Sequence, residues 1–182
     1  AIVLGVIQGL TEFLPLSSSG HLEITRELLN TNQLPSDNLL MTSVLHFATA
    51  LSTILVFRKD IYDLIKGMFE KENKTSKSYV IKILIAIVPA GLVGFLLSDQ
   101  IEFLFSGNMT LVGIMLIITG TLLFLTKILK TKNFKISKVH ALIIGLSQAF
   151  AVIPGISRSG ATICTSLFLG NNKSEAAKFS FL

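Results

Sequence analysis

The sequence has few charged residues and almost no cysteine. Only 15% of its 182 residues are Asp, Glu, Lys or Arg, whereas 51% are hydrophobic, and the hydrophobic residues come in long blocks. Soluble domains rarely have this composition, so the lipid bilayer is the expected solvent. The single cysteine, Cys164, excludes a disulfide within the chain, and its apolar neighbours indicate a buried small side chain rather than a reactive thiol.

The two ends of the sequence lack the usual marks of a complete chain. It starts at Ala1 rather than Met, and it stops at Leu182 after residues typical of a new apolar segment. We therefore expect a fragment, truncated at 182. The first apolar stretch also lacks a basic leader and a small-residue cleavage site, so we interpret it as mature structure rather than as a signal peptide.

Three apolar stretches are close to the roughly 20 residues that a membrane-spanning helix needs. They are Leu39–Phe57, Tyr79–Leu97 and Met109–Thr126. The net charge is +5, and most of the lysines and arginines lie in two blocks, 58–78 and 127–138, which argues for membrane topology and against a nucleic-acid partner. The connection 98–108 contains Asp99 and Glu102 and no Lys or Arg. The positive-inside rule therefore predicts that both basic blocks are cytoplasmic and the acidic connection external.

Two further apolar stretches, Ile2–Leu16 and Val139–Ile153, are too short to span. Each runs into a segment rich in proline, serine and glycine and is followed by a second short helical pattern. A helix, a break and a returning helix are typical of a re-entrant hairpin, and we expect such hairpins at 1–30 and 139–170.

The two hairpins match each other without a gap when 5–20 is aligned with 145–160. The identical pairs are Gly5 and Gly145, Gln8 and Gln148, Ser17 and Ser157, Ser19 and Ser159, and Gly20 and Gly160. These matches fall on polar and glycine positions, which apolar composition alone does not supply. We predict an all-α polytopic membrane protein, one membrane domain over 1–182, built as an inverted-topology repeat with two re-entrant hairpins. The first repeat covers about 1–97 and the second begins near 109.

Polar residues inside these short helices are the candidate site. Gln8 and Glu12 are stacked one helical turn apart, and a carboxylate in an apolar segment costs about 2.5–3.5 kcal/mol, so it normally faces a cavity and has a partner. The alternative is a helix-packing hydrogen bond or an interfacial position. We favour a functional role, holding a divalent cation or a proton.

The serine run after this helix supplies hydroxyl groups close to candidate bases. Ser17, Ser18 and Ser19 precede Gly20, and at least one of them is expected to cap the returning helix. With His21 adjacent and Glu12 a short distance before, the run contains a candidate nucleophile and candidate bases for phosphoryl transfer.

Arg158 is the most informative single residue of the second hairpin. A guanidinium between two apolar helices offers donors that match phosphate oxygens, although a side chain that merely reaches the cytoplasmic surface is the alternative. Ser157, Ser159 and Thr162 can add hydroxyl donors around the same anion. His46 and His140 receive no role.

Three motifs resemble those of a known family. QGLTEFLP at Gln8–Pro15, SSSGH at Ser17–His21 and PGISRSGAT at Pro154–Thr162 are similar to the signatures of the bacterial undecaprenyl-diphosphate phosphatases linked to bacitracin resistance. The resemblance covers the whole chain, with about the last third of the family's length beyond Leu182. It implies hydrolysis of undecaprenyl diphosphate to undecaprenyl phosphate and inorganic phosphate, which recycles the lipid carrier of cell-wall (peptidoglycan) precursors, in the bacterial plasma membrane.

The resemblance also implies residue roles. It places the catalytic carboxylate on Glu12, the candidate nucleophile on Ser18, the family's histidine on His21 and the phosphate-binding arginine on Arg158, with Ser157 and Thr162 beside it. It also implies a divalent cation. Our hypothesis is that Mg²⁺ or Ca²⁺ is held near Glu12 and Gln8, that His21 serves as base and then acid, and that Ser17 and Ser159 join the substrate-binding set. Gln8 stands where many members have a first glutamate, which leaves Glu12 as the sole strong anionic ligand of the motif.

A transporter is the alternative function, because inverted repeats and broken helices are widespread among secondary transporters. A polyprenyl-phosphate flippase would use the same anion site. A structural scaffold does not explain a buried Arg and Glu. A homodimer is left open.

Overall fold

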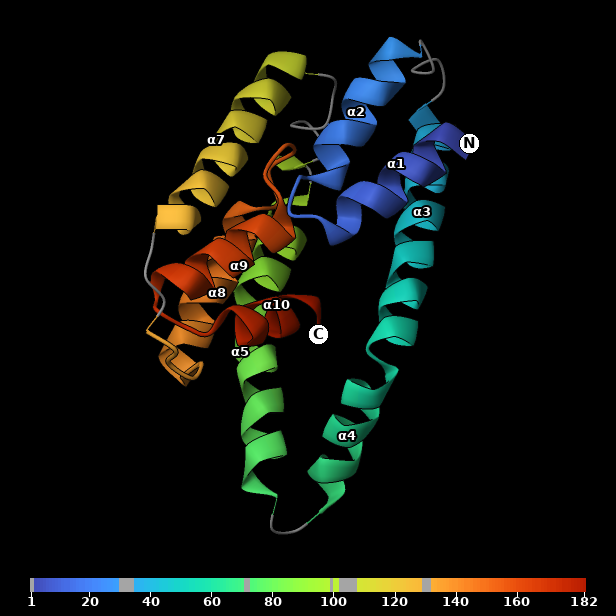
Figure 1. Ribbon diagram of the computed structural model, residues 1–182. Helices are drawn as coiled ribbons and strands as arrows, with labels where there is room; N and C mark the ends of the chain where they lie inside the picture. Colours follow the sequence, from blue (N-terminus) through green and yellow to red (C-terminus); the bar gives the residue numbers. More distant parts are fainter. Residues whose placement is uncertain (1, 30–34, 71–72, 99, 102–107, 129–131) are drawn as a thin grey trace.

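The computed structural model describes residues 2–29, 35–70, 73–98, 100–101, 108–128 and 132–182. These residues form helices, and the described part contains no β-strand beyond an isolated bridge between Phe134 and Asn171. The helices are α1 (Ile2–Phe13), α2 (Ser18–Leu28), α3 (Pro35–Val56), α4 (Arg58–Phe69), α5 (Lys74–Leu96), α7 (Met109–Ile128), α8 (Lys138–Phe150), α9 (Arg158–Phe168) and α10 (Lys173–Phe181). The all-α prediction is therefore confirmed for the described residues (Figure 1).

Two of the three expected spans are long and apolar enough to cross a membrane by themselves. These are α5 and α7. In the third, the stretch Leu40–Val56 of α3 meets the same criteria of length and hydropathy only together with α4, across a bend of 72°. The basic block 58–78 is largely helical, because α4 occupies Arg58–Phe69 and α5 begins at Lys74. Ile61, Leu64 and Gly67 of α4 lie on the less exposed face, a helical period that the many lysines of this segment conceal.

The direction of the helices agrees with the charge pattern. In Figure 1, α5 rises from its connection with α4 and α7 descends, so the basic blocks before α5 and after α7 lie toward the same side. Lys178 of α10 forms an ion pair with Asp60 of α4, which brings α10 to the first of these blocks. The acidic residues Asp99 and Glu102, on which the external assignment depends, lie outside the described residues.

The core lies where α5 crosses α8. A Cβ on Gly145 would be 2.5 Å from the carbonyl oxygen of Ala86, so only glycine allows the two backbones to approach this closely. Ala86 and Ile144 are buried there together with Ala141, Ile136 and Phe179. Cys164 of α9 is buried as well, as its apolar neighbours predict.

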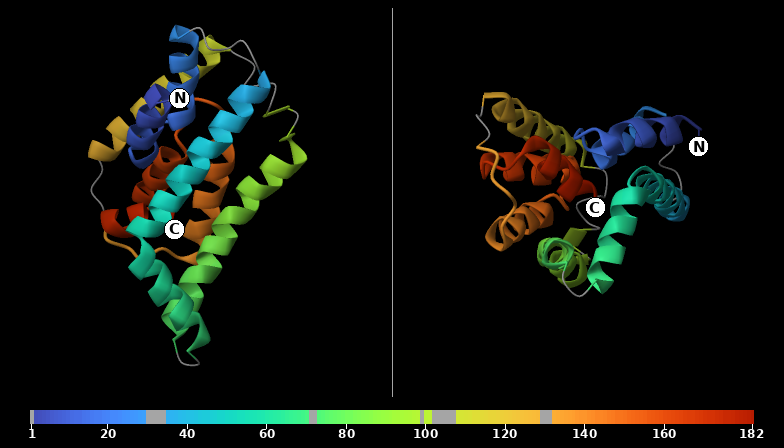
Figure 2. Two further views of the ribbon diagram at one scale, coloured as in Figure 1. Left: turned by 90° about the vertical axis from the view of Figure 1, so that its right-hand side faces the viewer. Right: turned by 60° about the horizontal axis from the view of Figure 1, so that its bottom comes forward.

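The two expected helix breaks, the loops between α1 and α2 and between α8 and α9, contact each other; Figure 2 shows these helices from two further sides. A Cβ on Gly20 would be 3.1 Å from the Cα of Gly155, and a Cβ on Gly160 would be 3.3 Å from the carbonyl oxygen of Pro15. Gly155 itself has a φ of 93°, a left-handed conformation that favours glycine. Two segments from opposite ends of the sequence are thereby fixed side by side.

The helices after the two breaks begin in the same way. α2 and α9 start and end at matching positions of the two aligned hairpins, and each has a serine as N-cap. Ser17 Oγ accepts from the Gly20 amide at 3.3 Å, and Ser157 Oγ accepts from the Gly160 amide at 3.0 Å. The returning helices begin at Ser18 and Arg158, directly after these caps, because each serine hydroxyl satisfies a backbone N–H of the first turn.

Candidate active site

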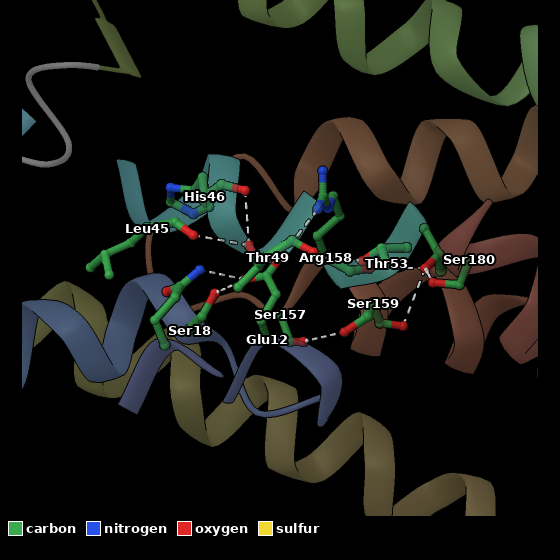
Figure 3. A network of polar contacts seen from close by, with 12 residues as sticks. Glu12, Ser18, Leu45, His46, Thr49, Thr53, Ser157, Arg158, Ser159 and Ser180 are labelled. Atoms are coloured by element: carbon green, nitrogen blue, oxygen red, sulfur yellow. Dashed lines mark hydrogen bonds and ion pairs between the residues drawn. The ribbon is translucent and has the colours of Figure 1, made fainter. Parts of the chain in front are cut away.

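Glu12 is the centre of a polar network that joins the two breaks (Figure 3). Its Oε2 accepts from Gln8 Nε2 at 3.0 Å and from Ser18 Oγ at 2.5 Å. Its Oε1 lies 3.3 Å from Arg158 Nη2. The carboxylate predicted to need a partner therefore has three, from α1, α2 and α9, and its side chain is 18% exposed.

The three serines of the first break have different positions. Ser17 is buried and caps α2, and its φ of 66° is a conformation that costs about 1–3 kcal/mol for a residue with a side chain. Ser19 Oγ lies 3.3 Å from Ser17 Oγ. Ser18 alone of the three bonds to Glu12. The strained backbone of Ser17 is thus part of the turn that brings the Ser18 hydroxyl to the Glu12 carboxylate.

Arg158 is the first residue of α9, and the backbone just before it is held from a third helix. Thr119 of α7 donates to the carbonyl oxygen of Gly155 at 3.1 Å and accepts from the amide of Ser157 at 3.1 Å. The sequence carries no signal for this role, because a threonine in an apolar span usually bonds to its own helix. The Arg158 side chain remains 66% exposed, so its guanidinium is accessible from the cavity.

Ser159 and Thr162 are placed differently within the second motif. Ser159 Oγ lies 3.3 Å from Ser157 Oγ, which repeats the arrangement of the first break. Thr162 Oγ1 is 2.6 Å from Ser180 Oγ of α10 and 3.0 Å from the carbonyl oxygen of Arg158. Ser180 is a polar residue of this site that the sequence analysis did not identify.

A cavity of about 340 Å³ adjoins this network. Seven residues of the two motifs that the sequence marks as the candidate site line this cavity: Glu12, Ser17, Ser18, Ser19, Ser157, Arg158 and Ser159. His46 of α3 and Gln148 of α8 line it too, although neither was assigned a role. The N-termini of α2 and α9 both open into it, which favours an anion there.

Three predicted residues do not line this cavity. Gln8 lies behind Glu12 and is 1% exposed, and Thr162 lines a neighbouring cavity of about 210 Å³ that also contains Arg158. His21 bonds through Nδ1 to the carbonyl oxygen of Ser17 at 2.8 Å. The structure therefore places Glu12, and not His21, beside the hydroxyl of Ser18.

The donor set near Gln8 fits a hard cation. Gln8 Oε1 is buried and has no hydrogen-bond partner among the described residues, while Nε2 of the same amide donates to the Glu12 carboxylate. Mg²⁺ and Ca²⁺ prefer such oxygen ligands. No group of three His, Cys, Asp or Glu side chains suited to a metal is present in the described part of the chain.

Comparisons with known proteins agree with the motif resemblance. The family model described as "Bacitracin resistance protein BacA" matches residues 1–182. An undecaprenyl-diphosphatase of Christiangramia forsetii is 54% identical over 182 residues, which cover 100% of this chain and 69% of that protein. Undecaprenyl-diphosphatases of Bacteroides fragilis and Methanococcus vannielii are 46% and 42% identical, over 68% and 72% of their own lengths.

Proposed function

Because this chain belongs to the bacitracin resistance protein BacA family, we propose that it is a membrane phosphatase that hydrolyses undecaprenyl diphosphate to undecaprenyl phosphate and inorganic phosphate. The observation that carries the mechanism is the position of Glu12, which contacts both the Ser18 hydroxyl and the Arg158 guanidinium. A nucleophile, a base and a phosphate ligand thus lie within one cavity. The names of the relatives give the transport alternative no support.

Arg158 and the N-termini of α2 and α9 bind the terminal phosphate in this mechanism. Ser18 Oγ attacks the terminal phosphorus, and its proton passes to Glu12. The bond between the phosphorus and the bridging oxygen breaks, so that the lipid phosphate leaves with the electron pair. Water then hydrolyses the phosphoserine, and the proton on Glu12 returns to Ser18. Attack by water without a phosphoserine uses the same base.

A divalent cation completes the proposed site. Glu12 and Gln8 would hold Mg²⁺ or Ca²⁺, and the ion would neutralise charge on the diphosphate. The buried Oε1 of Gln8 supports this assignment. A site with one carboxylate and one neutral amide should bind the cation more weakly than a site with two carboxylates.

The membrane arrangement is part of the proposal. The shared caps of α2 and α9, the contact between the two breaks and the location of both basic blocks toward one side support two re-entrant hairpins in an inverted repeat. We place the protein in the bacterial plasma membrane with the basic blocks in the cytoplasm. A homodimer is not required, because the described site residues come from one chain.

Phosphate release from undecaprenyl diphosphate by the full-length protein in detergent tests the function. No two-sided membrane exists there, so hydrolysis is measured and transport is not. We expect Glu12→Gln to lower kcat by about 10²–10⁴-fold, the usual contribution of a general base. Ser52→Ala is the control, because this exposed hydroxyl donates to Ala48 within α3. Normal turnover by Glu12→Gln would remove the carboxylate from the mechanism.

Ser18→Ala separates the two routes of attack. If Ser18 is the nucleophile, this variant loses turnover and no labelled phosphate remains attached to the quenched protein, whereas the unmodified protein carries it transiently. Turnover of Ser18→Ala close to normal would assign the attack to water.

A further inference from the structure

The cavity contains one titratable side chain that the proposed mechanism does not use. Among the described residues that line it, the titratable groups are Glu12, Arg158 and His46. Glu12 already accepts from Ser18 and pairs with Arg158, and a guanidinium does not lose its proton in proteins. His46 is therefore the remaining lining side chain that can act as a general acid or base.

The backbone of α3 fixes which nitrogen of His46 is available. His46 Nδ1 lies 2.9 Å from the carbonyl oxygen of Thr42. A carbonyl oxygen only accepts, so Nδ1 carries the hydrogen and Nε2 is the nitrogen left for chemistry. His21 has the same kind of bond, to the carbonyl oxygen of Ser17, but it does not line the cavity.

Neighbouring contacts fix the turn of α3 that carries His46. Thr49 Oγ1 donates to the carbonyl oxygen of His46 at 2.9 Å. Arg26, a buried residue of α2, donates to the side chain of Thr42 and forms an ion pair with Glu23. The first hairpin is thereby joined to α3 one turn before His46, which Figure 3 labels beside Leu45 and Thr49.

We propose that His46 is the acid that protonates the departing lipid phosphate, an inference that rests on the proposed phosphatase function. As Ser18 Oγ bonds to the terminal phosphorus and gives its proton to Glu12, the bridging oxygen takes the proton from His46 Nε2. Neutral His46 then accepts a proton from the water that hydrolyses the phosphoserine. Glu12 returns its proton to Ser18, so both groups recover their starting state.

The charged groups around His46 are few. Glu12 of α1 and Arg158 of α9 share its cavity, and the Glu23–Arg26 pair of α2 lies at Thr42. The charges of α4 begin further along the chain, at Arg58, about 18 Å away by helical rise. Glu12 and Arg158 are paired with each other, as are Glu23 and Arg26.

His46→Gln tests the proposal in the full-length protein. Phosphate monoesters have a second pKa of about 6, so the departing lipid phosphate needs only modest help from an acid. We therefore expect kcat to fall by about 100-fold, the low end of the range for general acid catalysis. KM should stay within about twofold. The fall of kcat at alkaline pH in the unmodified protein should disappear in His46→Gln, because glutamine does not titrate.

His140→Gln is the matched control, since His140 Nδ1 bonds to Asn171 and the residue does not line the cavity. His46→Ala repeats the measurement without any polar group. Normal kcat in both His46 variants, or a reduced kcat with the alkaline fall intact, would overturn the proposal while leaving the phosphatase function standing. Failure of the unmodified protein to release phosphate would overturn both.

Discussion

Removal of the Thr119 hydroxyl should disturb the active site from a helix that contributes no side chain to the cavity lining. Thr119 is 4% exposed, and its hydroxyl makes two hydrogen bonds, to Gly155 and Ser157, at the second break. Thr119→Val keeps the shape of the side chain and removes both bonds. A buried carbonyl and a buried amide then lose the partner that they have in the described structure.

The size of the effect follows from the two lost bonds. Each unsatisfied buried group costs about 1–3 kcal/mol, whereas hydrogen bonds between membrane helices average only about 0.6 kcal/mol with a maximum near 1.7. Two such bonds therefore give about 1–3 kcal/mol. Ser157 caps the helix that begins at Arg158, so the loss of these bonds should also displace the Arg158 guanidinium. We expect kcat to fall roughly tenfold, which is equivalent to about 1.4 kcal/mol.

Phosphate release and thermal unfolding in detergent measure the two consequences. Thr119→Ser keeps the hydroxyl and should behave almost normally. Thr121→Val is the matched control, because the exposed Thr121 donates to Ile117 within its own helix. The reasoning is refuted if Thr119→Val melts and turns over like the unmodified protein, or if Thr119→Ser is equally damaging.

Two further substitutions test the anion site and the packing of the core. Arg158→Lys keeps the charge but loses the planar fork, and the loss of one charge-assisted hydrogen bond of about 1.5–3 kcal/mol should lower kcat/KM by roughly 10–100-fold; equal kinetics would mean that only charge matters. Gly145→Val places a branched side chain against Ala86, where even a Cβ would be 2.5 Å from the carbonyl oxygen, so the melting temperature should fall. Gly91→Val, at a glycine whose Cβ would meet no atom within 4 Å, is the control, and similar melting of both variants would contradict the close approach of α5 and α8.

Much of the fold follows from local patterns. The all-α character, the two long apolar helices and the two helix breaks depend on hydrophobic length, proline, glycine and serine caps, which act within a short stretch of the chain. The sequence did not reveal α4, because its lysines conceal the helical period. It did not reveal the bend between α3 and α4 either, because a bend depends on the packing around it.

The candidate site was predictable where it depends on residue type. Glu12, Ser18 and Arg158 stand out because a charge or a hydroxyl next to a break needs a reason in an apolar chain. The roles of His21 and His46 were not predictable in this way. Ser18 and His21 are close in sequence, yet the turn at Ser17 directs Ser18 to Glu12 and leaves His21 bonded to the backbone.

The sequence by itself thus determined the solvent, the positions of the helices and the chemistry available at the two breaks, because these are properties of single residues and short segments. The tertiary structure decided which groups meet. Glu12 and Arg158 belong to hairpins that lie far apart in the sequence, and only the contact between the breaks brings their side chains within 3.3 Å. Helix packing likewise brings His46 and Ser180 to the cavity and Thr119 to the second break. No local sequence pattern encodes this packing.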